Sequence, residues 1–447
     1  MRRVPRSEYE ASPPARPRRS LWRRLAVLSL APMLALAATA ATAQGVWVTL
    51  PDMPGPFYSV VSSAAAKCPE GLRGTCVYAV SAIDVGDRQK LEAYSPASGT
   101  WVTLPAHRFP RYDPAATTAP CPGGVKGDCV YVIGGVGGGG ASLNTVEAYS
   151  TETNAWLTVR SMPTGRAETA AATAPCPDEL GLRGTCVYVF GGRAGTPLAT
   201  VEAYSPATNT WATLPPLQVA RQTHGGAAAP CPGDLQLHGT CVYAISGTGV
   251  PGLLPSVEVY SPALGQWQYA ADIPTPRVNF GAAAAPCPEG MSNGCVYTVG
   301  GSTAVDPVLN TFEAYTPATN AWATLPPLPS ARVNPGAATA PCLRNEHSHC
   351  VYALGGSTVT ASSAIAEAFA IESGRSGPNP KPEEKPKPNQ EAKPGDPHHT
   401  HPGHQPSPPH DSSDNLPLDL PEQEQEQEQE QEQRQEPQTA PAPAPAS

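Results

Sequence analysis

The chain has 447 residues and a formal net charge of −9, with 55 Pro, 41 Gly and only 6 Phe. So many residues that interrupt helices exclude a mainly helical protein, and no stretch shows a sustained apolar period of 3.6. The negative charge argues against a nucleic-acid partner, because phosphate binding needs a basic surface.

The N-terminal segment predicts export. Eight arginines in the first 24 residues precede an apolar run over 25–38, which is followed by the small residues Ala41-Thr42-Ala43. We interpret residues 1–43 as a signal peptide; an uncleaved anchor and a twin-arginine signal are the alternatives. The run is too short, and too interrupted by Pro32, for stable membrane insertion. We therefore expect a secreted, periplasmic or cell-surface protein.

The next part of the chain is a repeat with a period of about 55 residues. Six tryptophans are separated by 54 to 56 residues, and six pairs of cysteines have the same period. Because an exported chain meets an oxidising compartment, these pairs predict six disulfides, each within one repeat. The pairs are Cys68–Cys76, Cys121–Cys129, Cys176–Cys186, Cys231–Cys241, Cys287–Cys295 and Cys342–Cys350.

Each repeat contains four short strands. In the third repeat we expect them at Glu168–Ala174, Cys186–Gly192, Thr200–Tyr204 and Thr210–Leu214. Four strands in about 55 residues match a radial β-propeller better than a solenoid. The alanines of each first strand suit a narrow central channel, and the aromatic residues can fill the wedges between blades. The predicted fold is all-β, with six blades.

The repeats closely resemble the kelch repeat over about residues 45–371. The family's marks are an apolar run ending in Gly-Gly, then Glu-x-Tyr, then Trp, as in Gly191-Gly192, Glu202-Ala203-Tyr204 and Trp211. Ser246-Gly247 and Ser81-Ala82 replace two of the glycine pairs, so we expect these two blades to turn differently after their second strand.

The first and last repeats complement each other. Trp47 has no repeat before it, whereas the sixth repeat ends after Glu367-Ala368-Phe369 without a tryptophan. The resemblance implies that the N-terminal strand closes the ring by completing the sixth blade. We assign residues 44–372 to one propeller. Residues 373–447, which are rich in Pro, His, Glu and Gln, are predicted to be a disordered tail. Its histidines at 398–410 can be a metal-binding tract or a polar low-complexity tract, and we favour the second.

The strongest site-like feature is a ring of arginines at the start of the innermost strands. Two roles are open: binding an anionic ligand at one channel mouth, or tying neighbouring blades together by bonding loop carbonyls. The first repeat has Tyr58 at this position, and His224 lies where the repeats differ, as do Asp113, Glu168, Asn279 and Asn334. The predicted ligand-binding residues are Arg111, Arg166, Arg221, Arg277, Arg332, Tyr58 and His224.

The expected function is an exported binding or scaffold module that recognises a protein or glycan, anionic in part, through one face of a monomeric propeller. The alternative is a carbohydrate-active enzyme resembling the sialic acid mutarotases. The sequence offers no catalytic triad, phosphate loop or zinc-binding helix, and we predict neither a cofactor nor a metal site. Variable loops after the glycine pairs, at 136–144, 194–199 and 248–255, mark the arginine-bearing face as the binding face.

Overall fold

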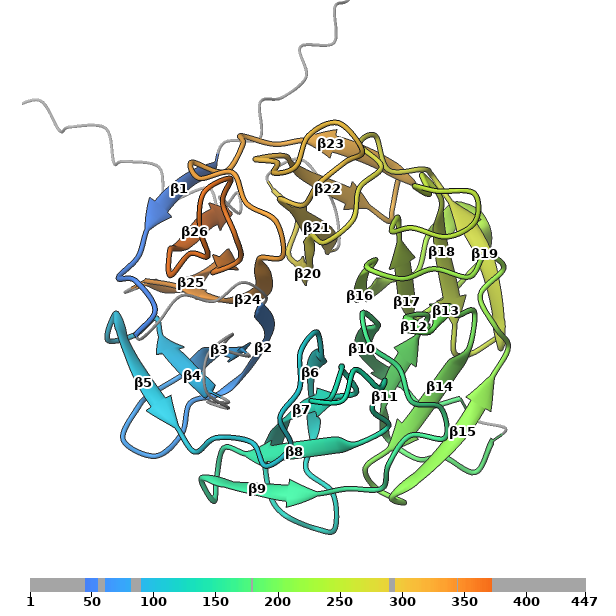
Figure 1. The fold of residues 1–447 in the computed structure, drawn as a ribbon, viewed down its shortest axis with the longest axis horizontal. Helices are drawn as coiled ribbons and strands as arrows, with labels where there is room; N and C mark the ends of the chain where they lie inside the picture. Colours follow the sequence, from blue (N-terminus) through green and yellow to red (C-terminus); the bar gives the residue numbers. More distant parts are fainter. Residues whose placement is uncertain are drawn as a thin grey trace, which may run out of the picture. The chain divides into compact units, whose positions relative to one another are not determined.

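The computed structural model describes residues 45–54, 61–81, 90–177, 180–288, 294–343 and 345–371. They form six antiparallel sheets of four strands, arranged radially around a channel (Figure 1). The predicted six-bladed propeller is therefore confirmed. The predicted signal peptide, the predicted tail and Tyr58 lie outside the described residues.

The strands of each blade follow one another from the channel outward, except in the sixth blade. Blade 1 contains β2 (Val61–Lys67), β3 (Thr75–Ser81), β4 (Lys90–Ser95) and β5 (Thr100–Leu104). Blade 2 contains β6 (Ala115–Pro120), β7 (Asp128–Ile133), β8 (Val146–Ser150) and β9 (Ala155–Thr158). Blade 3 contains β10 (Ala170–Pro175), β11 (Thr185–Phe190), β14 (Val201–Ser205) and β15 (Thr210–Leu214).

The remaining blades have the same plan. Blade 4 contains β16 (Gly225–Pro230), β17 (Thr240–Ile245), β18 (Val257–Ser261) and β19 (Gln266–Ala270), with a 3-10 turn at Gly233–Leu235. Blade 5 contains β20 (Gly281–Ala285), β21 (Cys295–Val299), β22 (Phe312–Thr316) and β23 (Ala321–Thr324). Blade 6 contains β24 (Gly336–Cys342), β25 (Asn345–Leu354), β26 (Ala366–Ile371) and β1 (Gly45–Thr49). A small ribbon, β12 (Arg193–Ala194) and β13 (Thr196–Pro197), follows β11.

The N-terminal strand closes the ring, as the resemblance implied. Strand β1 pairs antiparallel with β26, from Gly45 opposite Ile371 to Thr49 opposite Glu367. Its Trp47 ring packs on Phe312 of blade 5 and Phe369 of blade 6, with centroids 5.0 and 5.4 Å away. The first and last parts of the propeller thus share one sheet (Figure 1).

Small residues line the channel and aromatic residues fill the wedges, as expected. A cavity of about 370 Å³ within the channel is lined mainly by alanines and threonines of the innermost strands. Between blades, Tyr78 packs against Tyr149 and Tyr131 against Tyr204, with centroids 6.2 and 6.1 Å apart. Every repeated tryptophan donates its indole N–H to a carbonyl after the outer strand of the preceding blade, as Trp156 does to Pro105 at 2.6 Å.

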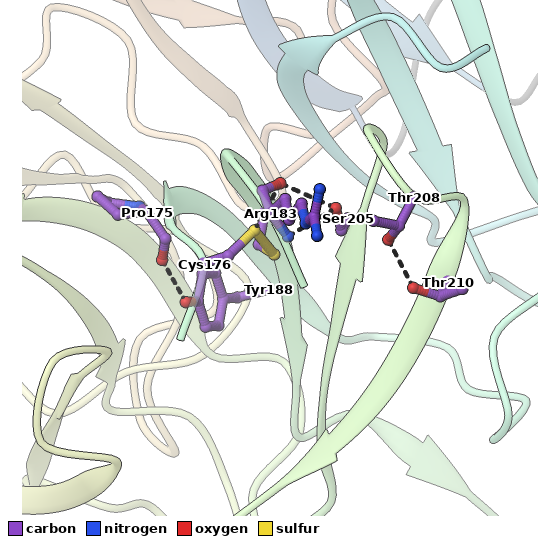
Figure 2. The surroundings of a disulfide bond; sticks show 8 residues. Pro175, Cys176, Arg183, Tyr188, Ser205, Thr208 and Thr210 are labelled. Carbon is purple, nitrogen blue, oxygen red and sulfur yellow. Dashed lines mark hydrogen bonds between the residues drawn. A yellow bond between two sulfur atoms is a disulfide. The ribbon is translucent and has the colours of Figure 1, made fainter. Parts of the chain in front are cut away.

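All six predicted disulfides are present, each joining the first and second strands of its own blade. Beside each bridge, the tyrosine of Cys-Val-Tyr donates its hydroxyl to the carbonyl preceding the first cysteine, as Tyr188 does to Pro175 (Figure 2). The turn between these strands is therefore fixed by both the disulfide and the tyrosine hydrogen bond. We call the face that carries these turns the disulfide face.

The turn after the second strand is the same in blade 4 as in the blades with a glycine pair, so the expected difference is wrong there. Ser246 and Gly247 have φ of 53° and 90°, close to 61° and 89° at Gly191 and Gly192. The strained φ of Ser246 is tolerated because its buried hydroxyl accepts a hydrogen bond of 2.9 Å from the Arg277 N–H. Residue 82 of the corresponding pair in blade 1 lies outside the described residues.

Candidate functional site

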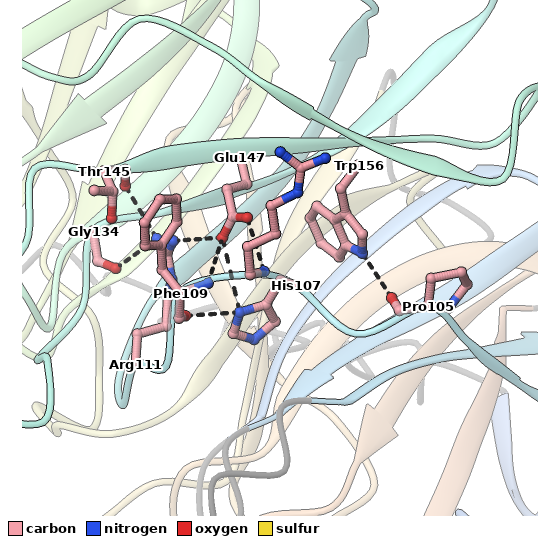
Figure 3. Close-up of polar contacts among 9 residues, drawn as sticks. Pro105, His107, Phe109, Arg111, Gly134, Thr145, Glu147 and Trp156 are labelled. Atoms are coloured by element: carbon pink, nitrogen blue, oxygen red, sulfur yellow. Dashed lines mark hydrogen bonds and ion pairs between the residues drawn. The ribbon is translucent and has the colours of Figure 1, made fainter. Parts of the chain in front are cut away.

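The five arginines are buried within the blades. Their side chains form hydrogen bonds and ion pairs with residues of the same blade. In blade 2, Arg111 forms an ion pair of 2.7 Å with Glu147 and donates to the carbonyls of Gly134 and Thr145, each at 3.0 Å (Figure 3). The same glutamate accepts the Arg108 backbone N–H at 2.9 Å. The corresponding pairs are Arg166–Glu202, Arg221–Glu258, Arg277–Glu313 and Arg332–Glu367.

The backbone at each arginine joins neighbouring blades. The carbonyl of Arg166 accepts the Gly135 N–H at 2.9 Å, and its own N–H donates to Leu143 O of the preceding blade at 3.0 Å. Of the two roles left open by the sequence, these residues therefore have a structural one: the backbone ties adjacent blades and the side chain ties strands within one blade. A guanidinium that is buried and paired with a carboxylate cannot bind an anionic ligand. Our expectation that the five arginines bind a ligand at the channel mouth is therefore wrong.

The side chains that do line the mouth come two residues after each arginine. Asp113, Glu168, Thr223, Asn279 and Asn334 all have positive φ, between 50° and 58°. Their backbones form a chain of hydrogen bonds around the opening, in which the N–H of each of the last four donates to the carbonyl of its counterpart in the preceding blade, at 2.7 to 3.3 Å. We call these five residues the mouth ring, and the propeller face that carries it the mouth face.

Residues of the mouth ring border a hollow of about 110 Å³. The Glu168 carboxylate pairs with Arg193 of β12 at 2.6 Å, and both side chains are partly exposed. Burial and the charge of Glu168 raise the pKa of Asp113, while Arg193 opposes this shift. Within the described part of the chain, no hydrogen bond or ion pair holds the Asp113 carboxylate.

His224 also lines the hollow, as part of its floor, and is the one described residue of the predicted ligand-binding set that does so. Its imidazole is only 7% exposed and packs beside Phe190 of blade 3. Burial and the nearby Arg221 hold the pKa of His224 well below its ordinary value, so the ring is neutral at pH 7. The Phe190 carbonyl opposes this shift as a hydrogen-bond acceptor, and both ring nitrogens are enclosed, without contact to solvent.

The loops on the mouth face differ between blades and carry apolar tips. Val250, Val305 and Val359 lie after the second strands of blades 4, 5 and 6 and are 85%, 84% and 73% exposed. A shallow groove follows blades 2 and 3 and is bordered by 140–142, 163–165 and 193–195. The mouth face thus combines a small polar hollow with separate, exposed apolar loop tips.

Comparison with known proteins supports the resemblance. The family model described as the kelch motif matches residues 117–163, 182–218 and 290–329. The chain belongs to the kelch-repeat β-propeller family. It is 30% identical to mouse Kelch-like protein 35 over 54% of this chain and 35% of that protein. It is 25% identical to Kelch-like protein terF of Aspergillus terreus over 55% of this chain and 52% of that protein.

The matched region spans about a third to a half of these relatives. Human Kelch-like protein 23, for example, is 26% identical over 51% of this chain and 34% of its own length. A kelch propeller indicates a protein-binding scaffold. Among the described residues, no helix is long and apolar enough to cross a membrane. The same residues contain no cluster of three or more His, Cys, Asp or Glu that could hold a metal ion.

Proposed function

We propose that this kelch propeller is an exported scaffold that binds a protein partner through its mouth face. The observation that carries the proposal is the difference between the two faces. The disulfide face repeats one bridged turn in every blade, whereas the mouth face has loops of different length with exposed valines at three tips. Variable loops on a rigid scaffold are the usual place of recognition.

Export is supported by the cysteines. All 12 are paired in disulfides, and such bridges persist in oxidising compartments. A protein partner fits the mouth face because its contacts are spread over the exposed loop tips and a shallow groove, while the hollow of about 110 Å³ is small beside the roughly 300–1,000 Å³ of ordinary small-molecule pockets. Nothing in the described lining of the hollow favours the mutarotase-type enzyme.

The experiment compares two triple variants with matched chemistry. Val250, Val305 and Val359 are replaced together by Asp on the mouth face. In the control, Leu180, Leu264 and Leu343, which are exposed in turns of the disulfide face, are replaced together by Asp. Partners cross-linked to the secreted wild-type protein are identified by mass spectrometry, and their capture by both variants is measured.

We expect the valine variant to lose capture while the leucine variant keeps it, with cross-links concentrated on residues 136–144, 194–199 and 248–255. Capture that survives the valine changes and disappears with the leucine changes would move the site to the disulfide face and overturn the proposal.

A further inference from the structure

Strand β1 is the last strand of its sheet, and its outer edge, at the rim of the propeller, is paired with no described strand (Figure 1). Just after the strand, the Leu50 N–H donates to the Ala366 carbonyl beside β26 at 2.9 Å. Because the backbone groups of successive residues point to opposite edges of a strand, the residues of even number in β1 bond β26. The outer edge therefore presents the backbone N–H and carbonyl groups of the alternate residues, which are Gly45, Trp47 and Thr49.

Two exposed valines lie on one side of this edge strand. Val46 is 62% exposed and Val48 is 43% exposed, whereas Trp47 between them packs on Phe312 of blade 5 from the other side. Because alternate residues of a strand share a face, the two valines form one apolar patch. At the equivalent positions, the other outer strands carry residues that are small, polar or partly buried. These are Thr100 and Val102, Ala155 and Leu157, Thr210 and Ala212, Gln266 and Gln268, and Ala321 and Ala323.

The edge of β1 has none of the features that prevent strands from pairing. Natural proteins protect an exposed edge with charged side chains, proline or a β-bulge. Strand β1 reads Gly-Val-Trp-Val-Thr, and its register with β26 is regular. Valine, tryptophan and threonine are also residue types that strands prefer. A strand added at this edge would bond the outward backbone groups and cover the two valines.

The sequence of β1 is symmetrical about Trp47, which makes the strand complementary to itself. In an antiparallel pair of copies centred on Trp47, Gly45 lies opposite Thr49, in the type of pair that exchanges two backbone hydrogen bonds. Val46 then lies opposite Val48 of the second copy, in the type of pair whose side chains approach most closely. Such directly opposite pairs are what stabilises a sheet. Both copies use the same surface, as a twofold interface requires.

We infer that two copies of this chain associate edge to edge through β1, so that their two four-stranded sheets of blade 6 become one continuous sheet. The contact uses one short strand of each copy. It should therefore bury less than the roughly 1,200–2,000 Å² of a standard interface, and the dimer should be weak and reversible. This association differs from the monomer that we expected from the sequence. It uses the rim of the propeller, leaves the mouth face free, and does not rest on the proposed function.

The test measures association of the full-length protein by sedimentation velocity, from about 10 μM to about 1 mM. The variant V46K/V48K places lysines opposite lysines across the pair of strands. The matched control Q266K/Q268K adds the same charges at the equivalent positions of β19. A third variant, V46E/V48E, is measured alone and mixed with V46K/V48K, because the mixture places each lysine opposite a glutamate. Thermal melting checks that each variant is folded, and V46T/V48T, which keeps β-branched side chains, replaces any charged β1 variant that is not.

We expect the wild type and Q266K/Q268K to form dimers whose fraction rises with concentration. V46K/V48K should raise the dissociation constant by about tenfold or more, because like charges directly opposite each other destabilise a strand pair. Mixing it with V46E/V48E should restore dimers.

A wild type that stays monomeric at the highest concentration, or a V46K/V48K variant that associates like the wild type, would overturn the inference. A mixture that stays monomeric would exclude the antiparallel register on which the inference depends. Because β1 lies at the rim, V46K/V48K should still capture the partner of the mouth face. The result is therefore separate from the capture experiment that tests the proposed function.

Discussion

Two ion pairs that start only two residues apart in the chain have opposite characters. Arg166 and Glu202 are buried, and Arg166 also donates to two backbone carbonyls; a buried arginine–glutamate pair recurs at the same position in four other blades. Glu168 and Arg193 are partly exposed and occur once; Glu168 borders the mouth hollow, and Arg193 borders the groove along blades 2 and 3. In a repeat protein, an identical charged residue in most units points to the scaffold. The position where the units differ is where a particular site can be built.

Removing the closing strand is expected to have the largest effect on this scaffold. Deletion of residues 44–51 removes β1, exposes the β26 edge and leaves the aromatic contacts of Phe312 and Phe369 without Trp47. The variant should aggregate or melt far below the wild type in a thermal scan. A chain truncated after Ser373 is the control and should melt like the wild type. Equal stability of the deletion variant would mean that the ring closes in another way.

The next effect separates the two ion pairs directly. R166A leaves Glu202 buried without its cation, which typically costs about 3–5 kcal/mol. E168Q breaks a partly exposed pair, which should cost about 1 kcal/mol or less. Urea unfolding of both variants measures the two losses. If the two substitutions cost the same, the distinction between scaffold and site at these positions fails.

Disulfide removal should have an intermediate effect. Replacing Cys121 and Cys129 together by serine opens a loop closed over 8 residues, which in the chain-entropy model costs roughly 2–3 kcal/mol. The Tyr131 hydroxyl still bonds the Pro120 carbonyl, so the turn should keep its shape. Circular dichroism and urea unfolding would detect the loss. Partner capture should be unchanged, because this turn lies on the disulfide face, and a loss of capture would contradict the proposed site.

The smallest expected effect depends on pH. Burial and Arg111 lower the pKa of His107 to about 4, against an ordinary value of 6.5. Between these values the unfolded chain takes up a proton that the folded protein does not bind. Stability should therefore be complete above about pH 6.5 and decrease as the pH falls toward 4, and His224 acts in the same direction.

Urea midpoints at pH 7.5 and pH 5 measure this loss. H107Q should show a smaller difference between the two pH values than the wild type, whereas H238Q, at an exposed position, should behave like the wild type. An H107Q variant with the full wild-type difference would assign the pH dependence to other groups.

Much of the scaffold was predictable because its marks recur in every unit. The period of the tryptophans predicted the number of blades, and the cysteine pairs predicted the disulfides. The incomplete repeats at the two ends, one beginning at Trp47 and one ending after Phe369, indicated how the ring closes. The expected first strand of blade 3 began two residues early, at Glu168. That residue has φ of 52° and belongs to the mouth ring instead of the sheet, a backbone conformation that its residue type does not reveal.

The direction of a side chain was decided only by the tertiary structure. The sequence places Arg166 and Glu202 36 residues apart, and nothing in their spacing says that the blade folds one onto the other. Strand pairing across β11 and β14 brings them together and removes the arginine from the surface. For the same reason, the isolated position of Asp113 and the burial of His224 became visible only when six distant segments met at one channel mouth. Local pattern determines which residues form a blade, and packing between blades determines which of them a partner can reach.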